Sequence, residues 1–281
     1  MPWRWPRIRV ARFVGCARCV YIRCCPPHQY IPRVQVTSDE TCEVIYQDDF
    51  LVAINKPSGL LVHRSPIDRH ETRFALQLVR DQIGQRVYPV HRLDKPTSGV
   101  LLFALSSDIA RDVSAQFAAG TVRKEYLAVV RGHCPEAGQI DHALKEEWDR
   151  IADRDRRPDK AAQAATTHFR RLATVEIPFA VDRYPQSRYS LVALQPRTGR
   201  RHQLRRHMKH LGYPVIGDAK HGKGVHNRFF QSQYRCHRLL LACTGLQLQH
   251  PASAEVLCLN ARLDEPFTRV LQAFDWLQAV G

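Results

Sequence analysis

The sequence predicts an α+β fold built on a mixed, largely antiparallel β-sheet that is flanked by helices. Three observations lead to this prediction. Segments with alternating apolar residues outnumber segments with helical spacing, the two kinds do not alternate strictly, and Gly, Pro or Asp separates most of them. A strict strand–helix alternation would instead predict a parallel sheet.

The chain has 281 residues, of which 44% are hydrophobic and 25% are charged, as is typical of folded proteins. We expect residues 42–281 to form one folded domain. Residues 1–41 carry seven arginines and Cys16, Cys19, Cys24 and Cys25, and we expect a basic, poorly ordered extension. Cys16 and Cys19 lack a second cysteine or histidine pair at zinc-finger spacing, so no metal site is predicted.

The first folded segments read as two strands and a helix. Apolar residues alternate in residues 43–46 and 50–56, and the turn residues Asp48 and Asp49 separate these two expected strands. Residues 74–83 have apolar residues at helical spacing and are followed by Gly84, a residue that commonly ends a helix.

A polar loop follows, between two expected strands. Residues 88–91 form a short strand that leads into the loop at residues 92–96, and residues 99–105 read as a buried strand. Ser107 is the expected cap of a helix that runs to about Ala119 and ends at Gly120.

The second half of the chain continues the mixture of strands and helices. Residues 149–166 are rich in Asp, Arg, Ala and Pro without apolar periodicity, which predicts an exposed loop. The remaining predictions are strands at 124–130, 188–195 and 238–249, a basic helix at 199–210 ended by Gly212, and an amphipathic helix at 264–277.

The charge of the chain predicts a polyanionic partner. Lys and Arg exceed Asp and Glu by 42 to 27, a formal net charge of +15, which favours nucleic acid. No apolar run approaches the length of a membrane span, and the odd number of cysteines, nine, favours a reducing compartment. We expect a cytoplasmic protein, a monomer, with no membrane partner and no required protein partner.

Three segments combine polar residues with Gly or Pro, as functional loops often do. They are NKPSG at residues 55–59, HRLD at 91–94 and RTGRRHQLR at 197–205. Taken singly, an Asp before Lys-Pro is usually a solvated turn residue, and a Thr-Gly-Arg helix start is more often structural. Their joint occurrence in this order is what carries information.

Together these segments resemble the RluA family of pseudouridine synthases. The resemblance rests on VAINKPSG at 52–59 followed by VH at 62–63, on HRLD at 91–94 followed by TSGV at 97–100, and on TGRRHQLR at 198–205 followed by PVIGD at 214–218. It covers roughly residues 42–250 and implies the pseudouridine synthase catalytic fold for residues 42–281. Within that family, the chain most resembles a subgroup that modifies uridine 65 of tRNA. This narrower resemblance rests on the sequences at residues 63–65, 80–85 and 202–207.

The resemblance implies an isomerase whose catalytic residues are Asp94, Tyr126 and Arg200. Asp94 would be the catalytic carboxylate, close to the ribose C1′ atom. Arg200 would be the cationic partner that keeps a buried carboxylate ionised. Tyr126 would stack on uracil or transfer a proton. The reaction has no net redox change, so no cofactor is expected.

RNA is the partner that the charge and the resemblance imply, and the resemblance favours tRNA. Lys124 lies two residues from Tyr126 on an expected strand and so faces the same side. Arg92 is a candidate to hold the flipped nucleotide, with a plain phosphate contact as the equal alternative. The remaining RNA-binding candidates lie in or beside the basic helix and are Arg201, Arg205 and Arg206, of which Arg201 and Arg205 have i,i+4 spacing.

Three alternatives remain open at this point. The substrate could be a uridine of large-subunit ribosomal RNA, because the core motifs do not distinguish RNA targets. The chain could be a noncatalytic RNA-binding module, although the presence of Asp94, Tyr126 and Arg200 argues against it. A nucleic-acid N-glycosylase would release free uracil, whereas an isomerase keeps the base attached.

Overall fold

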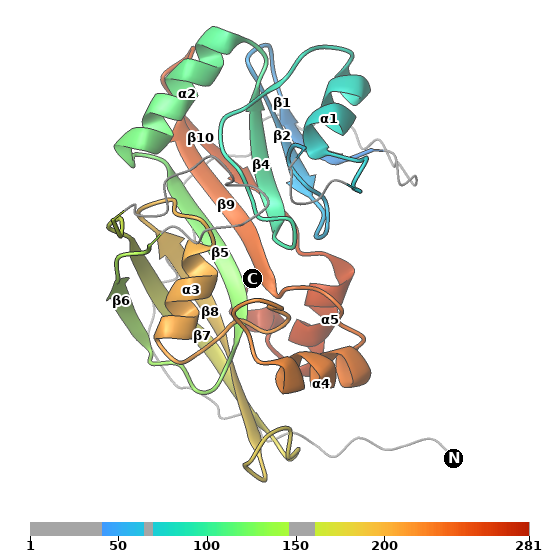
Figure 1. The fold of residues 1–281 in the computed structure, drawn as a ribbon. Coiled ribbons are helices and arrows are strands. Elements are labelled where there is room, and N and C mark those ends of the chain that lie inside the picture. The colour runs from blue at the N-terminus through green and yellow to red at the C-terminus, as the bar shows by residue number, and fades with distance from the viewer. Residues whose placement is uncertain (1–40, 65–69, 146–160, 281) are drawn as a thin grey trace.

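The computed structural model describes residues 41–64, 70–145 and 161–280 (Figure 1). The expected extension at residues 1–41 lies outside the described residues except for residue 41. The expected loop at 149–166 also lies mostly outside them, and Thr166 already belongs to a strand.

The described residues contain ten strands, and all of them join one sheet. The hydrogen-bonded order is β1-β2-β4-β9-β5-β8-β7-β6, while β3 pairs with β4 and β10 pairs with β9. Every pairing is antiparallel except β4 with β9. The predicted fold class is therefore confirmed. The strands are β1 Glu43–Gln47, β2 Leu51–Lys56, β3 Tyr88–Pro89, β4 Ser98–Ala104, β5 Arg123–Arg131, β6 Ala137–Asp141, β7 Thr166–Ile177, β8 Ser187–Pro196, β9 Leu241–Gln249 and β10 Val256–Asn260.

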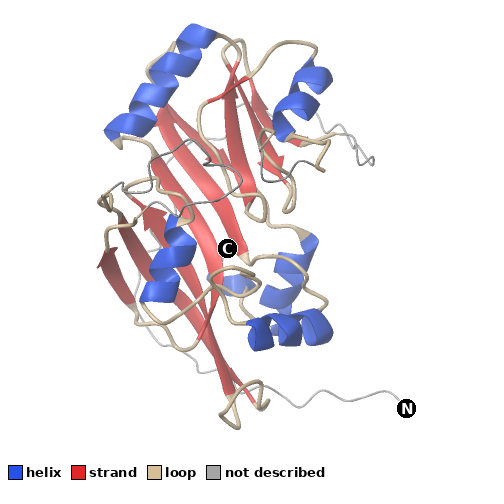
Figure 2. Ribbon diagram, in the orientation of Figure 1, coloured by secondary structure: helices blue, strands red, loops and turns tan. Residues whose placement is uncertain are grey.

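Five α-helices of the described chain pack around this sheet (Figure 2). They are α1 Ala75–Ile83, α2 Ser107–Ala119, α3 Gln203–His210, α4 Gly224–Tyr234 and α5 Glu265–Ala273, followed by a 3-10 turn at Leu277–Ala279. Gly84 and Gly120 end α1 and α2 in the left-handed conformation, as expected. The cap of α2 is Ser106 rather than Ser107, because the Ser106 side chain accepts a hydrogen bond from the amide of Ile109.

Helix α3 begins later than the sequence predicts. His202 has a left-handed backbone with φ 53°, and the helix starts only at Gln203. The Gln203 side chain closes the preceding turn, since its Oε1 accepts hydrogen bonds from Thr198 Oγ1 and the amide of Arg200. Arg201 therefore lies outside the helix, and the expected i,i+4 stripe with Arg205 does not form on it.

Strand β5 is the centre of the molecule, because both of its faces are buried. Leu127 and Val129 point into the core that α4 and α5 cover, whereas Ala128 and Val130 point into the core beneath α3. A third core lies under α1 and α2, against β2 and β4. The loop that precedes β4, the start of α3 and the middle of β5 are thereby held at the junction of these layers.

Candidate active site

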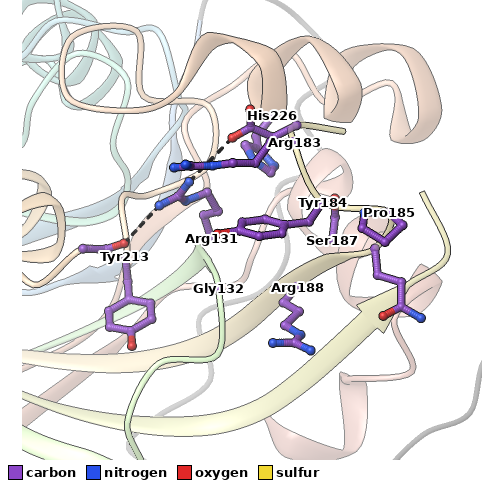
Figure 3. Close-up of a pocket in the computed structure, with 12 residues that line it drawn as sticks. Arg131, Gly132, Arg183, Tyr184, Pro185, Ser187, Arg188, Tyr213 and His226 are labelled. Carbon is purple, nitrogen blue, oxygen red and sulfur yellow. Dashed lines mark hydrogen bonds and ion pairs between the residues drawn. The ribbon is translucent and has the colours of Figure 1, made fainter. Parts of the chain in front are cut away.

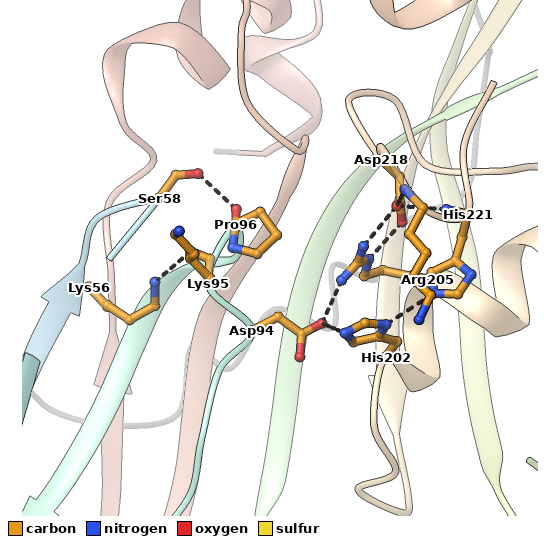
Figure 4. Close-up of polar contacts among 10 residues, drawn as sticks. Lys56, Ser58, Asp94, Lys95, Pro96, His202, Arg205, Asp218 and His221 are labelled. Atoms are coloured by element: carbon orange, nitrogen blue, oxygen red, sulfur yellow. Dashed lines mark hydrogen bonds and ion pairs between the residues drawn. The ribbon is translucent and has the colours of Figure 1, made fainter. Parts of the chain in front are cut away.

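The loop that carries Asp94 is tied down by the segment at residues 55–59 (Figure 4). Gly59 N donates to the carbonyl oxygen of Lys95 at 2.8 Å, and Ser58 Oγ donates to that of Pro96, also at 2.8 Å. The Lys56 ammonium nitrogen reaches the Lys95 carbonyl at 3.2 Å. The segment at residues 55–59 thus fixes the backbone of the two residues that directly follow the carboxylate.

Lys56 is a fully buried residue at the centre of these contacts. Its Nζ also donates to the carbonyl oxygens of Pro57 and Leu60, each at 2.8 Å, so three acceptors surround it. Burial, aided by the charge of Arg238 and opposed by that of Asp94, lowers the pKa of Lys56 to about 7. The position of the Asp94 loop consequently depends on a titratable group beneath it.

Asp94 is paired with Arg205, which bridges two carboxylates. Arg205 Nη1 donates to Asp94 Oδ2 at 3.1 Å, while its Nε and Nη2 donate to the two oxygens of Asp218 at 2.7 and 2.8 Å. Burial acts to raise the pKa of Asp218, but the hydrogen bonds and charge of Arg205 outweigh it and lower that pKa. The guanidinium is thus held rigidly, with its remaining edge aimed at Asp94.

Arg200, the expected cationic partner of Asp94, is not paired with it in this structure. Arg200 lies on the exposed turn before α3, and its Nε donates to the carbonyl oxygen of Ala164 at 3.2 Å. The turn closed by Gln203 directs Arg200 away from the carboxylate. Arg205, in the first turn of α3, takes that position instead.

His202 is a second neighbour of Asp94 that the sequence did not indicate. Its Nε2 lies 3.9 Å from Asp94 Oδ2, and its Nδ1 shares a hydrogen bond of 3.0 Å with Nε2 of the buried His221. Burial lowers the pKa of His202 to about 4, against the opposing charge of Asp94. At neutral pH the imidazole is uncharged, so Arg205 supplies the positive charge beside Asp94.

Tyr126 lies on β5 at an irregularity in its pairing with β9. The register shifts between Glu125 and Tyr126, and Tyr126 pairs with Cys243 while Thr244 is skipped. Burial raises the pKa of Tyr126 well above its usual value, and a hydrogen bond with the Cys243 thiol and the charge of Asp94 add to the shift. The phenol is therefore protonated at neutral pH and lies within electrostatic reach of Asp94.

Lys124 and His91 share the environment behind the site. Burial lowers the pKa of Lys124, and it lowers that of His91 to about 3, with the charge of Lys124 as the second cause. His91 Nε2 accepts a hydrogen bond from the amide of Leu102 at 3.0 Å, and its ring stacks on Phe117. His91 thus anchors the start of the Asp94 loop to β4 as a neutral residue.

The expected RNA-binding arginines differ in exposure. Arg92 is exposed and forms no hydrogen bond or ion pair with the described residues, whereas Arg201 and Arg206 are half-buried. Arg206 Nη1 donates to the carbonyl oxygen of Lys145 at 2.9 Å. Arg205, also expected to bind RNA, is instead buried and donates to the carboxylates of Asp218 and Asp94.

Two residues that support the site were missed by the sequence analysis. Asp218 and His221 support Arg205 and His202, yet nothing beyond the position of Asp218 in a motif pointed to either. Among the described residues, no group of three or more His, Cys, Asp or Glu could hold a metal ion. None of the helices in the described ranges is long and apolar enough to cross a membrane.

Comparison with known proteins places this geometry in context. Residues 50–210 match a family model described as RNA pseudouridylate synthase. A protein of Pectobacterium carotovorum named tRNA pseudouridine synthase C is 55% identical over 245 residues, which cover 87% of this chain and 65% of that protein. A protein of Yersinia pestis with the same name is 55% identical over 234 residues, 83% of this chain and 91% of that protein. The solved structure of human RNA Pseudouridylate Synthase Domain Containing 4 has a TM-score of 0.61 and 28% identity, and the match covers 83% of this chain and 93% of that chain.

Proposed function

The chain belongs to the RNA pseudouridylate synthase family, and from that premise we propose that it converts uridine 65 of tRNA to pseudouridine with Asp94 as the catalytic carboxylate. The family is an isomerase family, so the reaction class follows from membership. The choice of tRNA is supported by the names of the relatives at 55% identity. The cytoplasm is the compartment in which we expect the reaction.

The observation that carries the role of Asp94 is the asymmetry of its two oxygens. Oδ2 faces both Arg205 and His202, whereas Oδ1 takes part in no hydrogen bond or ion pair with a described residue. The side chain is 20% exposed, so the carboxylate is accessible without being freely solvated. We assign Oδ1 to the substrate, because Oδ2 is already engaged.

The isomerisation breaks the bond between ribose C1′ and uracil N1, turns the base, and joins C1′ to C5. A proton leaves C5 and another is gained at N1, so atoms and charge balance without a redox partner. A carboxylate oxygen beside C1′ stabilises the positive charge that develops there or adds to the electrophile. Arg205 donates a hydrogen bond to this carboxylate at 3.1 Å and so holds it in place for either route.

Tyr126 completes the proposed site by holding the base. Its phenol is protonated at neutral pH, so the ring face is better suited to stacking than the hydroxyl is to removing a proton. The target uridine must leave its stack to reach Asp94, and exposed Arg92, two residues away, is positioned to hold the extruded nucleotide.

The test is to map pseudouridine in unmodified transcripts. The purified protein is incubated with tRNA and ribosomal RNA, without cofactor or metal, and pseudouridine is located by carbodiimide modification and primer extension. Asp94→Asn is compared with Asp108→Asn, which changes an exposed carboxylate on α2. We expect a single stop at position 65 of tRNA that disappears only in Asp94→Asn.

Other outcomes identify other functions. A stop confined to ribosomal RNA keeps the chemistry and replaces the substrate. Release of free uracil indicates an N-glycosylase, and RNA binding without any stop indicates a noncatalytic module. An undiminished stop with Asp94→Asn would remove Asp94 from the mechanism.

A further inference from the structure

A concave surface apart from the Asp94 site lies at the end of the sheet that carries the β7–β8 hairpin (Figure 3). Its volume of about 400 Å³ is within the range of small-molecule and nucleotide-sized sites. Three arginines, two tyrosines and one aspartate are among its lining residues: Arg131, Arg183, Arg188, Tyr184, Tyr213 and Asp182. Nothing in the reaction described above uses this pocket.

Positive charge predominates in the pocket even after its ion pairs are counted. Arg188 is bonded to Glu176, and Lys223 is bonded to Asp182, whose carboxylate also lies 4.0 Å from Arg131. Asp182 is thus shared between two cations, and Arg183 has no carboxylate partner among the described residues. The pocket suits an anionic ligand.

The same pocket offers an exposed aromatic face. Tyr184 is 64% exposed, although tyrosine is usually more buried. The Arg183 guanidinium lies over its ring, 5.5 Å from the centroid, and in Figure 3 the ring extends towards Arg131. An exposed ring between guanidinium groups is the combination that proteins use to stack a base and neutralise its phosphate.

The pocket is joined to the catalytic network by one short turn. Asp218, the carboxylate that holds Arg205, accepts the amides of Lys220 and His221, and the turn ends at Lys223, which pairs with Asp182 in the pocket. Along β5, Arg131 is five residues from Tyr126, a separation of about 17 Å at 3.4 Å per residue. A bound tRNA is long enough to reach both places.

We propose that this pocket binds a nucleotide of the RNA substrate away from the target uridine, with its base on Tyr184 and its phosphate between Arg131 and Arg183. The proposal rests on the proposed function, since it takes the RNA substrate as the ligand. It makes the pocket a determinant of which RNA is bound rather than part of the chemistry.

The test measures RNA affinity in the Asp94→Asn background, so that binding is read independently of turnover. Tyr184→Ala is expected to raise the Kd for full-length tRNA about 5- to 150-fold, the range for loss of one stacked base. Tyr184→Phe, which keeps the ring, is expected to restore affinity. Arg183→Ala should reduce the slope of log K against log salt by about one.

Matched controls change exposed residues outside the pocket. Val256 on β10 is 53% exposed, and the Arg111 side chain on α2 is 72% exposed. Val256→Ser and Arg111→Ala should leave the Kd unchanged. A short stem that contains only the base pairs around the target should bind equally well with Tyr or Ala at position 184.

The outcomes are separable. If Tyr184→Ala and Arg183→Ala leave the Kd for full-length tRNA within twofold of their parent, the pocket does not contact RNA and the proposal is overturned. If the wild-type protein makes no pseudouridine, the proposed function fails, while the Kd still decides whether the pocket contacts tRNA.

Discussion

Replacing Arg205 by lysine keeps one positive charge beside Asp94 but removes the guanidinium fork that spans two carboxylates. The fork makes three charge-assisted hydrogen bonds, two to the nearly inaccessible Asp218 and one to Asp94. A lysine ammonium is a single point and cannot reproduce this arrangement. Stability and catalysis should therefore both suffer, by separable amounts.

The magnitudes follow from the contacts. Breaking a buried pair costs about 3–5 kcal/mol of unfolding free energy, because Asp218 is left without its partner. Losing the bond to Asp94 removes about 1.5–3 kcal/mol, which lowers kcat/KM about 10- to 150-fold if that bond persists in the transition state. Denaturant unfolding measures the first quantity, and single-turnover pseudouridine formation measures the second.

The matched control is the same change at Arg200, which is exposed and bonded to a backbone carbonyl. Arg200→Lys should alter kcat/KM by less than about threefold and leave unfolding almost unchanged, within the roughly 0.5 kcal/mol of surface substitutions. If Arg205→Lys keeps full activity and stability, or if Arg200→Lys is the more damaging change, the assignment of Arg205 as the partner of Asp94 is refuted.

Three further predictions concern other parts of the site. The pKa of Lys56 falls to about 7 on folding, so between pH 7 and about 10 the folded state binds fewer protons than the unfolded state and the free energy of unfolding rises with pH. Lys56→Met should remove this contribution and make the rise smaller. Denaturant titrations at several pH values measure the slope, and an unchanged slope would contradict the assignment to Lys56. Gly99→Ala should abolish soluble folded protein, because the new Cβ would lie 2.0 Å from the Cys243 carbonyl oxygen. Gly59→Ala has open space around its Cβ and should cost only about 1–3 kcal/mol of backbone strain. Thermal melts that show equal destabilisation by the two substitutions would contradict this. Tyr126→Phe should keep turnover within about tenfold of the wild-type rate, and Tyr126→Ala should not, because stacking requires only the ring. A loss of about 100-fold or more in Tyr126→Phe would indicate that the hydroxyl transfers a proton.

Local sequence signals predicted the fold where the chain obeys local rules. The strands at residues 43–56 have a clean alternation and a turn, and the helices that end at Gly84 and Gly120 have glycine stops. Strands β6, β7 and β10 and helix α4 were missed. Strand β7 carries Arg170 and Arg171 in its middle, and a half-exposed strand next to an edge tolerates such charges because only one face is packed.

The candidate site was predictable in its motifs but not in its pairings. HRLD and NKPSG pointed to the Asp94 loop, and the structure brings these segments together. The choice between Arg200 and Arg205 depends on the left-handed turn at His202, a non-glycine residue with positive φ that no local pattern announces. Asp218 gains its role only through contact with a helix thirteen residues earlier in the chain.

The bond between Arg205 and Asp94 joins residues 111 positions apart in the chain. Contacts of such long range form late and slowly, because the intervening chain must first be ordered. Recovery of catalytic activity after dilution from denaturant should therefore follow the slowest refolding phase rather than the return of helix or strand signals. For the same reason, neither half of the chain expressed separately should acquire activity, so turnover reports on completion of the whole sheet.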